Sequence, residues 1–262
     1  MRRWSLGQLT VIGVRPYELV EIAARSGYDA VCPIVGLIDI PGLPLVPLKA
    51  GDAETERMAR SLKANDIIFN NADGFVLDAQ TDLNDVRRMV DLVAALGARS
   101  INALIFDADL PRGIATLAAL DEMAAGARLP VFLEFLPISA VASAKDAQAV
   151  IAETGSTNIR LMIDAMHLSQ SGGGPDDMRA LSKAIGSAQL CDAPAKLPFE
   201  EYKRMIMEER WAPGDGELPL VDFMAALPQD LICAIEVPRL DEPDLVARAK
   251  RMLAAGRAVD QA

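Results

Sequence analysis

Four polar side chains stand at the ends of apolar stretches in the second half of the sequence. They are Glu134 in VFLEFLP, Asp164 in IRLMIDAMH, Gln189 in SAQLCDAP and Glu236 in ICAIEVP. An isolated carboxylate in apolar surroundings is costly unless it is paired or binds a metal. Three carboxylates and an amide oxygen are hard oxygen ligands, which suit Mg²⁺ or Mn²⁺ better than Zn²⁺. The pattern predicts that these four residues bind one divalent metal.

Each of the four residues also has a purely structural interpretation. Glu134 could pair with an internal arginine or lysine, and Asp164 could cap the N-terminus of a short helix that follows it. Gln189 could hydrogen-bond to backbone groups, and Glu236 could form an ion pair with Arg239. The shared metal site is favoured because the four residues end four successive strands.

Two further residues are candidates for binding substrate. His167 is the single histidine of the chain and follows Asp164 by three residues, so one helical turn would bring both side chains to the same mouth. Arg210 begins RWAPGDG, a proline- and glycine-rich loop that would direct it inward. The alternatives are a histidine satisfied within the core and a surface arginine after an acidic helix.

The elements that must position these residues recur along the chain. A helical pattern ends at a glycine or asparagine, and a short apolar run follows, as at Gly27 before YDAVCPIV and Gly155 before STNIRLMID. Strands are expected near residues 6, 30, 67, 101, 131, 160, 188 and 233. Amphipathic helices are expected at Tyr17–Arg25 and Val86–Leu96.

The order of these elements predicts the fold. Short strands that are apolar on both faces and separated by helices are typical of a buried parallel sheet. Eight such units indicate a single (β/α)₈ TIM barrel over residues 1–262, with its chemistry at the carboxyl ends of the strands. The first strand is expected at Leu6–Val11, the last at Ile232–Val237 and the final helix at Pro243–Ala255. An open doubly wound sheet is the rival, but no glycine-rich phosphate turn follows the first strand.

Composition limits the classes of partner and location. The 262 residues are 51% hydrophobic and 24% charged, with a net charge of -11. Such an acidic surface repels nucleic acid. Three cysteines without a C-x-x-C motif favour a reducing, cytoplasmic location. The apolar stretch Ala30–Leu48 contains four prolines, so no membrane span is expected there.

The motifs LEFLP, MIDAMH, AQLCDAP, RWAPGDGELPL and AIEVP together resemble the xylose isomerase-like TIM barrels, the sugar phosphate isomerase/epimerase group. The resemblance implies that Glu134, Asp164 and Glu236 bind the metal, that both glutamates exchange substrate protons, and that His167 and Arg210 contact substrate. The family usually has a ligating histidine where this chain has Gln189, which shifts the expected metal toward Mg²⁺ or Mn²⁺. The histidine-rich endonuclease branch is disfavoured.

The expected function is a metal-dependent isomerase or epimerase that acts on a sugar or polyol, phosphorylated or not, through an enediolate. Glu134 and Glu236 are the expected acid and base. The alternative is a metal-dependent dehydratase of a cyclic keto-polyol or dehydroshikimate-like substrate, and a third reading is a barrel that binds a ligand without turning it over. Family resemblance also suggests a homodimer. Aromatic residues that could line the mouth, or simply pack, are Trp4, Phe69, Phe75, Phe106 and Trp211.

Overall fold

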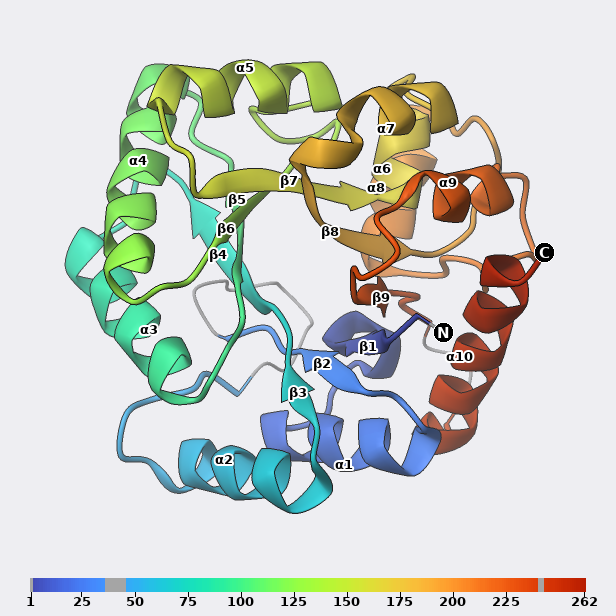
Figure 1. Ribbon diagram of the computed structural model, residues 1–262, viewed down its shortest axis with the longest axis horizontal. Helices are drawn as coiled ribbons and strands as arrows, with labels where there is room; N and C mark the ends of the chain where they lie inside the picture. The colour runs from blue at the N-terminus through green and yellow to red at the C-terminus, as the bar shows by residue number, and fades with distance from the viewer. Residues whose placement is uncertain (1, 36–45, 240–242) are drawn as a thin grey trace.

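The computed structural model describes residues 2–35, 46–239 and 243–262, and these form a nearly closed parallel barrel surrounded by helices (Figure 1). The strands of this part of the chain are β1 (Trp4–Gly7), β2 (Ala30–Cys32), β3 (Ile68–Phe69), β4 (Ala72–Leu77), β5 (Ile101–Ile105), β6 (Val131–Glu134), β7 (Ile159–Asp164), β8 (Ile185–Leu190) and β9 (Cys233–Ile235). The strand order is β3-β2-β1-β9-β8-β7-β6-β5-β4. The predicted TIM barrel is confirmed.

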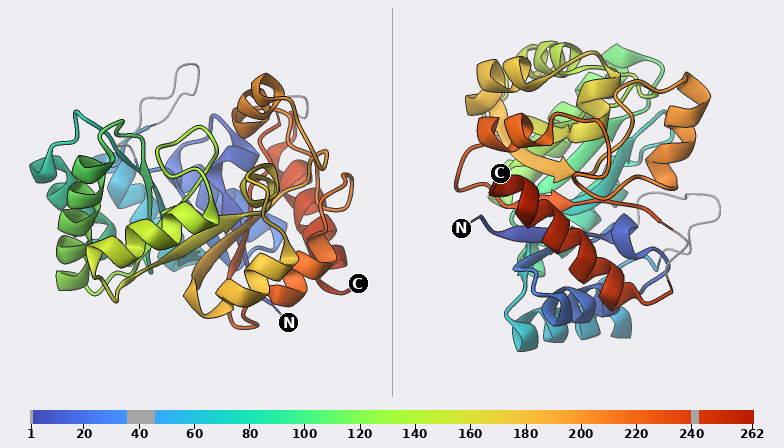
Figure 2. Two further views of the ribbon diagram at one scale, coloured as in Figure 1. Left: turned by 90° about the horizontal axis from the view of Figure 1, so that it is seen from above. Right: turned by 90° about the vertical axis from the view of Figure 1, so that its right-hand side faces the viewer.

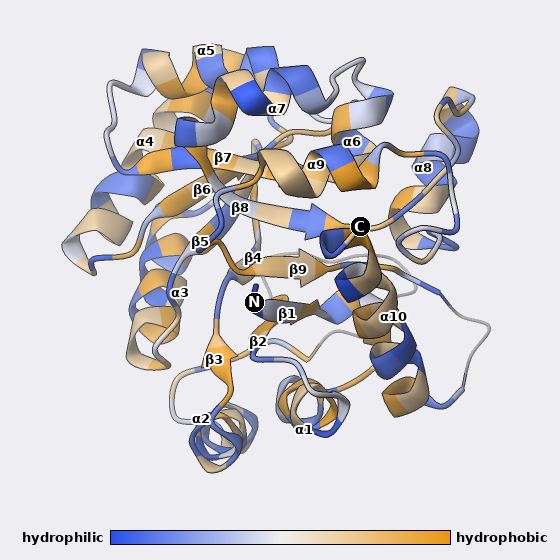
Figure 3. Cartoon of the chain, turned by 45° about the vertical axis from the view of Figure 1, so that its right-hand side comes forward, coloured by the Kyte–Doolittle hydropathy of each residue, from blue (hydrophilic) through white to orange (hydrophobic). Residues whose placement is uncertain are grey.

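Helices connect successive strands around the outside of the barrel. They are α1 (Pro16–Ser26), α2 (Ala53–Asn65), α3 (Leu83–Ala95), α4 (Leu110–Gly126), α5 (Ala144–Thr154), α6 (Ala165–Gln170), α7 (Pro175–Leu181), α8 (Phe199–Met207), α9 (Leu220–Ala226) and α10 (Leu245–Asp260). α1 ends at Gly27, whose positive φ of 85° is the left-handed cap expected there. In Figure 3 hydrophilic residues run along the outward helices α2 and α10, while the central strands are largely hydrophobic.

The third predicted strand is divided into β3 and β4, which are the two ends of the sheet. The division falls at Asn70 and Asn71. The Asn71 side chain accepts a hydrogen bond from Ser100 Oγ and donates one to Asp73 Oδ1. Beyond the break, the Asp73 backbone N–H donates to the carbonyl of Pro33, next to β2. The same chain segment therefore joins the two ends of the sheet.

Several predicted boundaries are wrong: the last strand is shorter than Ile232–Val237, the last helix continues past Ala255 to Asp260, and the first strand and the start of the last helix also differ. The first strand stops at Gly7 and continues as a 3₁₀ turn, η1 (Gln8–Val11). Thr10 fixes this turn, because its hydroxyl donates to the carbonyl of Ile235 and accepts from the Val237 N–H. The last helix begins at Leu245 rather than at a proline, because the preceding Asp244 side chain caps it. A second short 3₁₀ turn, η2 (Ser182–Ala184), precedes β8.

The two ends of the chain lie on the same side of the molecule, as both views in Figure 2 show, and Arg2 and Asp260 form an ion pair at 3.1 Å. No helix within the described residues is long and apolar enough to cross a membrane. Residues 36–45 of the proline-containing stretch lie outside that part of the chain. The cytoplasmic location and the homodimer stay predictions.

Candidate functional site

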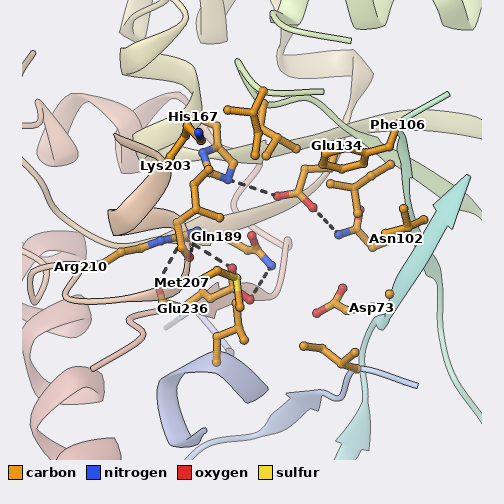
Figure 4. Close-up of a pocket in the computed structure, with 18 residues that line it drawn as sticks. Asp73, Asn102, Phe106, Glu134, His167, Gln189, Lys203, Met207, Arg210 and Glu236 are labelled. Carbon is orange, nitrogen blue, oxygen red and sulfur yellow. Dashed lines mark hydrogen bonds and ion pairs between the residues drawn. The ribbon is translucent and has the colours of Figure 1, made fainter. Parts of the chain in front are cut away.

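A cavity of about 390 Å³ opens at the carboxyl ends of the strands (Figure 4). Five of the six predicted site residues line it, namely Glu134, His167, Gln189, Arg210 and Glu236. The sixth, Asp164, is fully buried and lies outside the cavity lining, in contact with Arg210. The carboxyl ends of the strands meet at one mouth of the barrel, and they therefore bring together residues that are far apart in sequence.

Glu134 is the last residue of β6, and its carboxyl group points into the cavity. Asn102 Nδ2 donates to Glu134 Oε2 at 2.6 Å, and His167 Nε2 lies 3.8 Å from Oε1. Burial raises the pKa of Glu134 to about 8, and the charges of Glu236 and Asp164 act in the same direction. The group holds a proton at neutral pH and can donate it.

Glu236 directly follows β9 and lies on the opposite wall. Its Oε1 accepts a hydrogen bond from Gln189 Nε2 at 3.2 Å, and its Oε2 lies 3.5 Å from Arg210 Nη1. Burial raises the pKa of Glu236 to about 7 despite the opposing charge of Arg210. A side chain at Gly7 would have no room, since a Cβ there would lie 3.3 Å from Glu236 Oε1 and 2.9 Å from the Ile235 carbonyl. Glycine at this position lets Glu236 fit.

Asp164 has two structural partners in this geometry. Its Oδ1 accepts from the His167 backbone N–H at 2.9 Å, which makes it the N-cap of α6. Its Oδ2 accepts from Arg210 Nη1 at 2.8 Å. Burial opposes ionisation, but the interactions with His167 and Arg210 outweigh it and lower the pKa of Asp164. The helix-cap interpretation is confirmed, and Asp164 is ionised and paired.

Arg210 is buried, so the surface interpretation of this residue is wrong. Its guanidinium donates to the carbonyls of Met205 at 3.3 Å and Ile206 at 3.1 Å, at the end of α8. These carbonyls have no partner within the helix, and a cation near a helix C-terminus is stabilising. The interactions with Asp164 and the end of α8 hold the guanidinium in one orientation at the cavity wall.

The loop after Arg210 is organised by the carboxylate of Asp192. Its Oδ2 accepts from the backbone N–H groups of Gly214 at 2.9 Å and Gly216 at 3.0 Å, and its Oδ1 accepts from the Leu218 N–H at 3.1 Å. A Cβ at position 216 would lie 2.3 Å from Asp192 Oδ1. The Pro-Gly-Asp-Gly motif therefore wraps a carboxylate closely, and only glycine permits that approach.

His167 is buried and lines the cavity beside Glu134. The hydroxyl of Tyr202 on α8 lies 3.0 Å from His167 Nδ1. Burial lowers the pKa of His167 to about 4 although Asp164 acts in the opposite direction. The imidazole is neutral at physiological pH, and Tyr202 orients it.

Asp73 and Asn102 also line the cavity, and the sequence analysis missed both. Asp73 lies at an irregularity of β4, where the register with β5 shifts and Gly74 adopts a φ of 99°. A bulge of this kind redirects a side chain, and Asp73 points into the cavity (Figure 4). Asn102 is the one polar residue of INALI. The sequence feature that could have identified Asn102 is a single polar residue within an otherwise apolar strand.

The donor chemistry is suited to a hard divalent cation. Gln189 Oε1 is buried without a hydrogen-bond partner, and the carboxyl groups of Glu134 and Glu236 face the same cavity. All three are oxygen donors of the type that Mg²⁺ and Mn²⁺ prefer. Asp164 differs, because Arg210 and a backbone N–H occupy its oxygens. As placed, no three His, Cys, Asp or Glu side chains of the described residues form a cluster that could hold an ion.

Similar architectures occur among solved structures. The D-allulose 3-epimerase from Methylomonas sp., in complex with D-allulose, has a TM-score of 0.75 and 16% identity, covering 98% of each chain. The IolI protein with a binding zinc atom has a TM-score of 0.74 and 16% identity, covering 99% of this chain and 96% of its own. The probable 3-DHS dehydratase AsbF from Bacillus anthracis has a TM-score of 0.74 and 13% identity, covering 98% of each.

At these identities the likeness establishes the shared fold. No curated protein matches the sequence. The family described as xylose isomerase-like TIM barrel matches residues 20–255, which is most of the chain and spans every candidate site residue. The barrel and the sequence match agree, and this chain belongs to the xylose isomerase-like TIM barrel family.

Proposed function

We propose that the protein is an isomerase or epimerase that moves a proton at a carbon next to a carbonyl group of a small hydroxy-carbonyl substrate. The observation that carries this proposal is the pair of buried glutamates in one cavity, whose pKa values are about 8 for Glu134 and about 7 for Glu236. Groups that exchange protons near neutral pH are effective general acids and bases. Burial has moved both carboxyl groups into that range.

We assign the two glutamates opposite roles in proton transfer. Glu236, which has the lower pKa, accepts the proton from the carbon next to the carbonyl. Glu134, which has the higher pKa and holds a proton in the metal-free protein, returns a proton to the neighbouring carbon or to the opposite face of the same carbon. The first outcome is aldose–ketose isomerisation, and the second is epimerisation. Arg210 and neutral His167 bind substrate oxygens at the cavity wall.

A divalent metal held by Glu134, Gln189 and Glu236 would supply Lewis-acid polarisation of the substrate carbonyl. Mg²⁺ or Mn²⁺ suits these oxygen donors better than Zn²⁺. The proposed ligand set is smaller than the four residues expected from sequence, because Asp164 is engaged with Arg210. Arg210 and Asp164 then form a buried ion pair beside the metal ligands.

The experiment is deuterium exchange into the carbon next to the carbonyl, followed by NMR in D₂O with a panel of ketoses and hydroxyketones. Glu236→Gln should abolish exchange, and Glu134→Gln should abolish product formation, while the fold is retained in both variants. Near-full turnover in either variant would refute the assignment. Glu153→Gln on the exposed face of α5 is the matched control, and it should leave exchange unchanged.

A dehydratase is the second candidate. The same abstraction by Glu236 can be followed by loss of a β-hydroxyl, and Glu134 carries the proton that the leaving group needs. A structural neighbour described as a probable dehydratase supports this alternative. Product mass separates the two, since loss of water indicates a lyase and an unchanged mass indicates an isomerase.

A further inference from the structure

The cavity has two layers of opposite character. Along β5 and the residue after it, Asn102, Leu104 and Phe106 alternate on one side of the strand, and each step of two residues rises about 7 Å toward the mouth. Glu134 and Leu136 repeat this order on the next strand, and all five side chains line the cavity. The polar groups therefore lie at the floor, and apolar side chains lie above them.

The apolar upper wall extends beyond β5. Val76, Ile138, Ile206 and Met207 join the apolar residues of β5, and all four are only partly buried. Phe106 is 39% exposed at the rim, one of the larger exposed apolar side chains of the described residues. Side chains of this kind are covered when an apolar group enters the cavity. The side chains of these apolar residues offer no hydrogen-bonding partner to a chain of hydroxyl groups.

Both cationic side chains of the described cavity lining have a carboxylate partner, which is buried for Arg210 and exposed for Lys203. Arg210 is paired with Asp164 at the floor. Lys203 is the other cationic side chain that borders the cavity, and its ammonium lies 3.3 Å from Glu200 Oε2 on the solvent side of α8. A phosphate ester would lose water at the mouth without gaining a bidentate partner.

We propose that the substrate is amphipathic: an α-hydroxyketone that carries an uncharged aryl or alkyl substituent, rather than a free sugar or a sugar phosphate. The hydroxy-carbonyl end meets the polar floor, and the substituent occupies the apolar upper layer beside Phe106 and Leu104. Hydroxyl groups of a ketose would be buried against this layer without partners, which opposes binding. This inference rests on the proposed function for the chemistry at the floor.

The test compares ligands that share the hydroxyketone unit. Binding of 1-hydroxy-3-phenylpropan-2-one, dihydroxyacetone, D-fructose and D-fructose 6-phosphate is measured by isothermal titration calorimetry. The phenyl compound should bind at least about tenfold more tightly than the other three, because only it fills the apolar layer. D-Fructose or its phosphate binding as tightly as the phenyl compound would overturn the inference.

Substitutions test whether the apolar upper wall causes the preference for the phenyl compound. Phe106→Ser should weaken binding of the phenyl compound about five- to tenfold and leave dihydroxyacetone unchanged. Phe199→Ser is the matched control, since Phe199 is 56% exposed on α8 and does not line the cavity. Equal weakening of both ligands by Phe106→Ser would contradict the proposal.

The same ligands separate failure of the inference from failure of the proposed function. Exchange of the carbon-bound proton in D₂O with D-fructose, but not with the phenyl compound, would overturn the inference and keep the proposed activity. Selective binding of the phenyl compound without exchange on any ligand would support the amphipathic site and refute the proposed activity.

Discussion

Glu134→Gln should make the protein more stable at alkaline pH while it abolishes activity. The pKa of Glu134 is about 8 in the folded chain, against an ordinary value of 4.5. As the pH rises from 4.5, the unfolded chain releases this proton first, and the folded chain keeps it until about pH 8. The folded state binds more protons throughout that interval, so its stability falls as the pH rises.

The size of this loss of stability follows from the pH interval in which only the unfolded chain has released the proton. Each pH unit in which only the unfolded state is ionised costs about 1.4 kcal/mol. Between about pH 5 and pH 8, Glu134 therefore reduces the free energy of unfolding by roughly 3–4 kcal/mol. Glu236 adds a smaller loss in the same direction because its pKa is about 7. Glutamine cannot ionise, so Glu134→Gln does not show the larger part of this loss of stability.

The assay is urea denaturation of EDTA-treated protein at several pH values, with wild type, Glu134→Gln and Glu153→Gln in parallel. The stability gained by Glu134→Gln over wild type should grow with pH, whereas Glu153→Gln should follow wild type, since Glu153 is exposed. A constant difference between Glu134→Gln and wild type from about pH 5 to pH 8 would refute the argument that burial holds this proton.

Three further predictions concern the residues that hold the site in place. Arg210→Met should lower the free energy of unfolding by about 3–5 kcal/mol, because the charged Asp164 loses its ion-pair partner. Adding Asp164→Asn to this variant should recover part of the lost stability, and no recovery would contradict the pairing. Asp192→Ala removes the acceptor of three backbone N–H groups in the loop that carries Arg210. Substrate affinity should therefore fall more than thermal stability. Unchanged affinity would count against a role of Asp192 in positioning this loop. Gly7→Ala should destabilise by about 1–3 kcal/mol in thermal unfolding, since a Cβ would lie 2.9 Å from the Ile235 carbonyl; a neutral effect would show that the strands can separate.

The order of strands could be predicted from the sequence because several apolar runs follow a residue that ends a helix. Gly27 and Gly155 end helices in the left-handed conformation, which depends only on neighbouring residues. The break between β3 and β4 was not readable, because it depends on Asn71 bonding to Ser100, a residue 29 positions away. The length of the first strand was misjudged for a similar reason, since Thr10 bonds to Ile235 of the neighbouring strand β9, 225 positions away in sequence.

The candidate site was predictable to the extent that strand-end polar residues stand out in apolar runs. Glu134 and Glu236 were found in this way. Their partners were harder to assign, because Arg210 meets Asp164 across 46 residues of sequence, and nothing local distinguishes that pairing from the expected substrate contact. Asp73 was missed because its inward direction comes from an irregularity in β4 rather than from strand alternation.

The charges around the cavity connect the proton and metal hypotheses. Arg210 balances Asp164, which leaves the carboxyl groups of Asp73, Glu134 and Glu236 to be neutralised by protons or by a bound cation. Burial raises the pKa of all three, so Mn²⁺ that binds at Glu134 and Glu236 near neutral pH must displace protons. Titration of Mn²⁺ at about pH 7 in two buffers of different ionisation enthalpy should reveal release of roughly one proton, and affinity should rise with pH. Binding of Mn²⁺ without proton release would mean that the glutamates are already ionised, and the proton-donor role assigned to Glu134 would then be wrong.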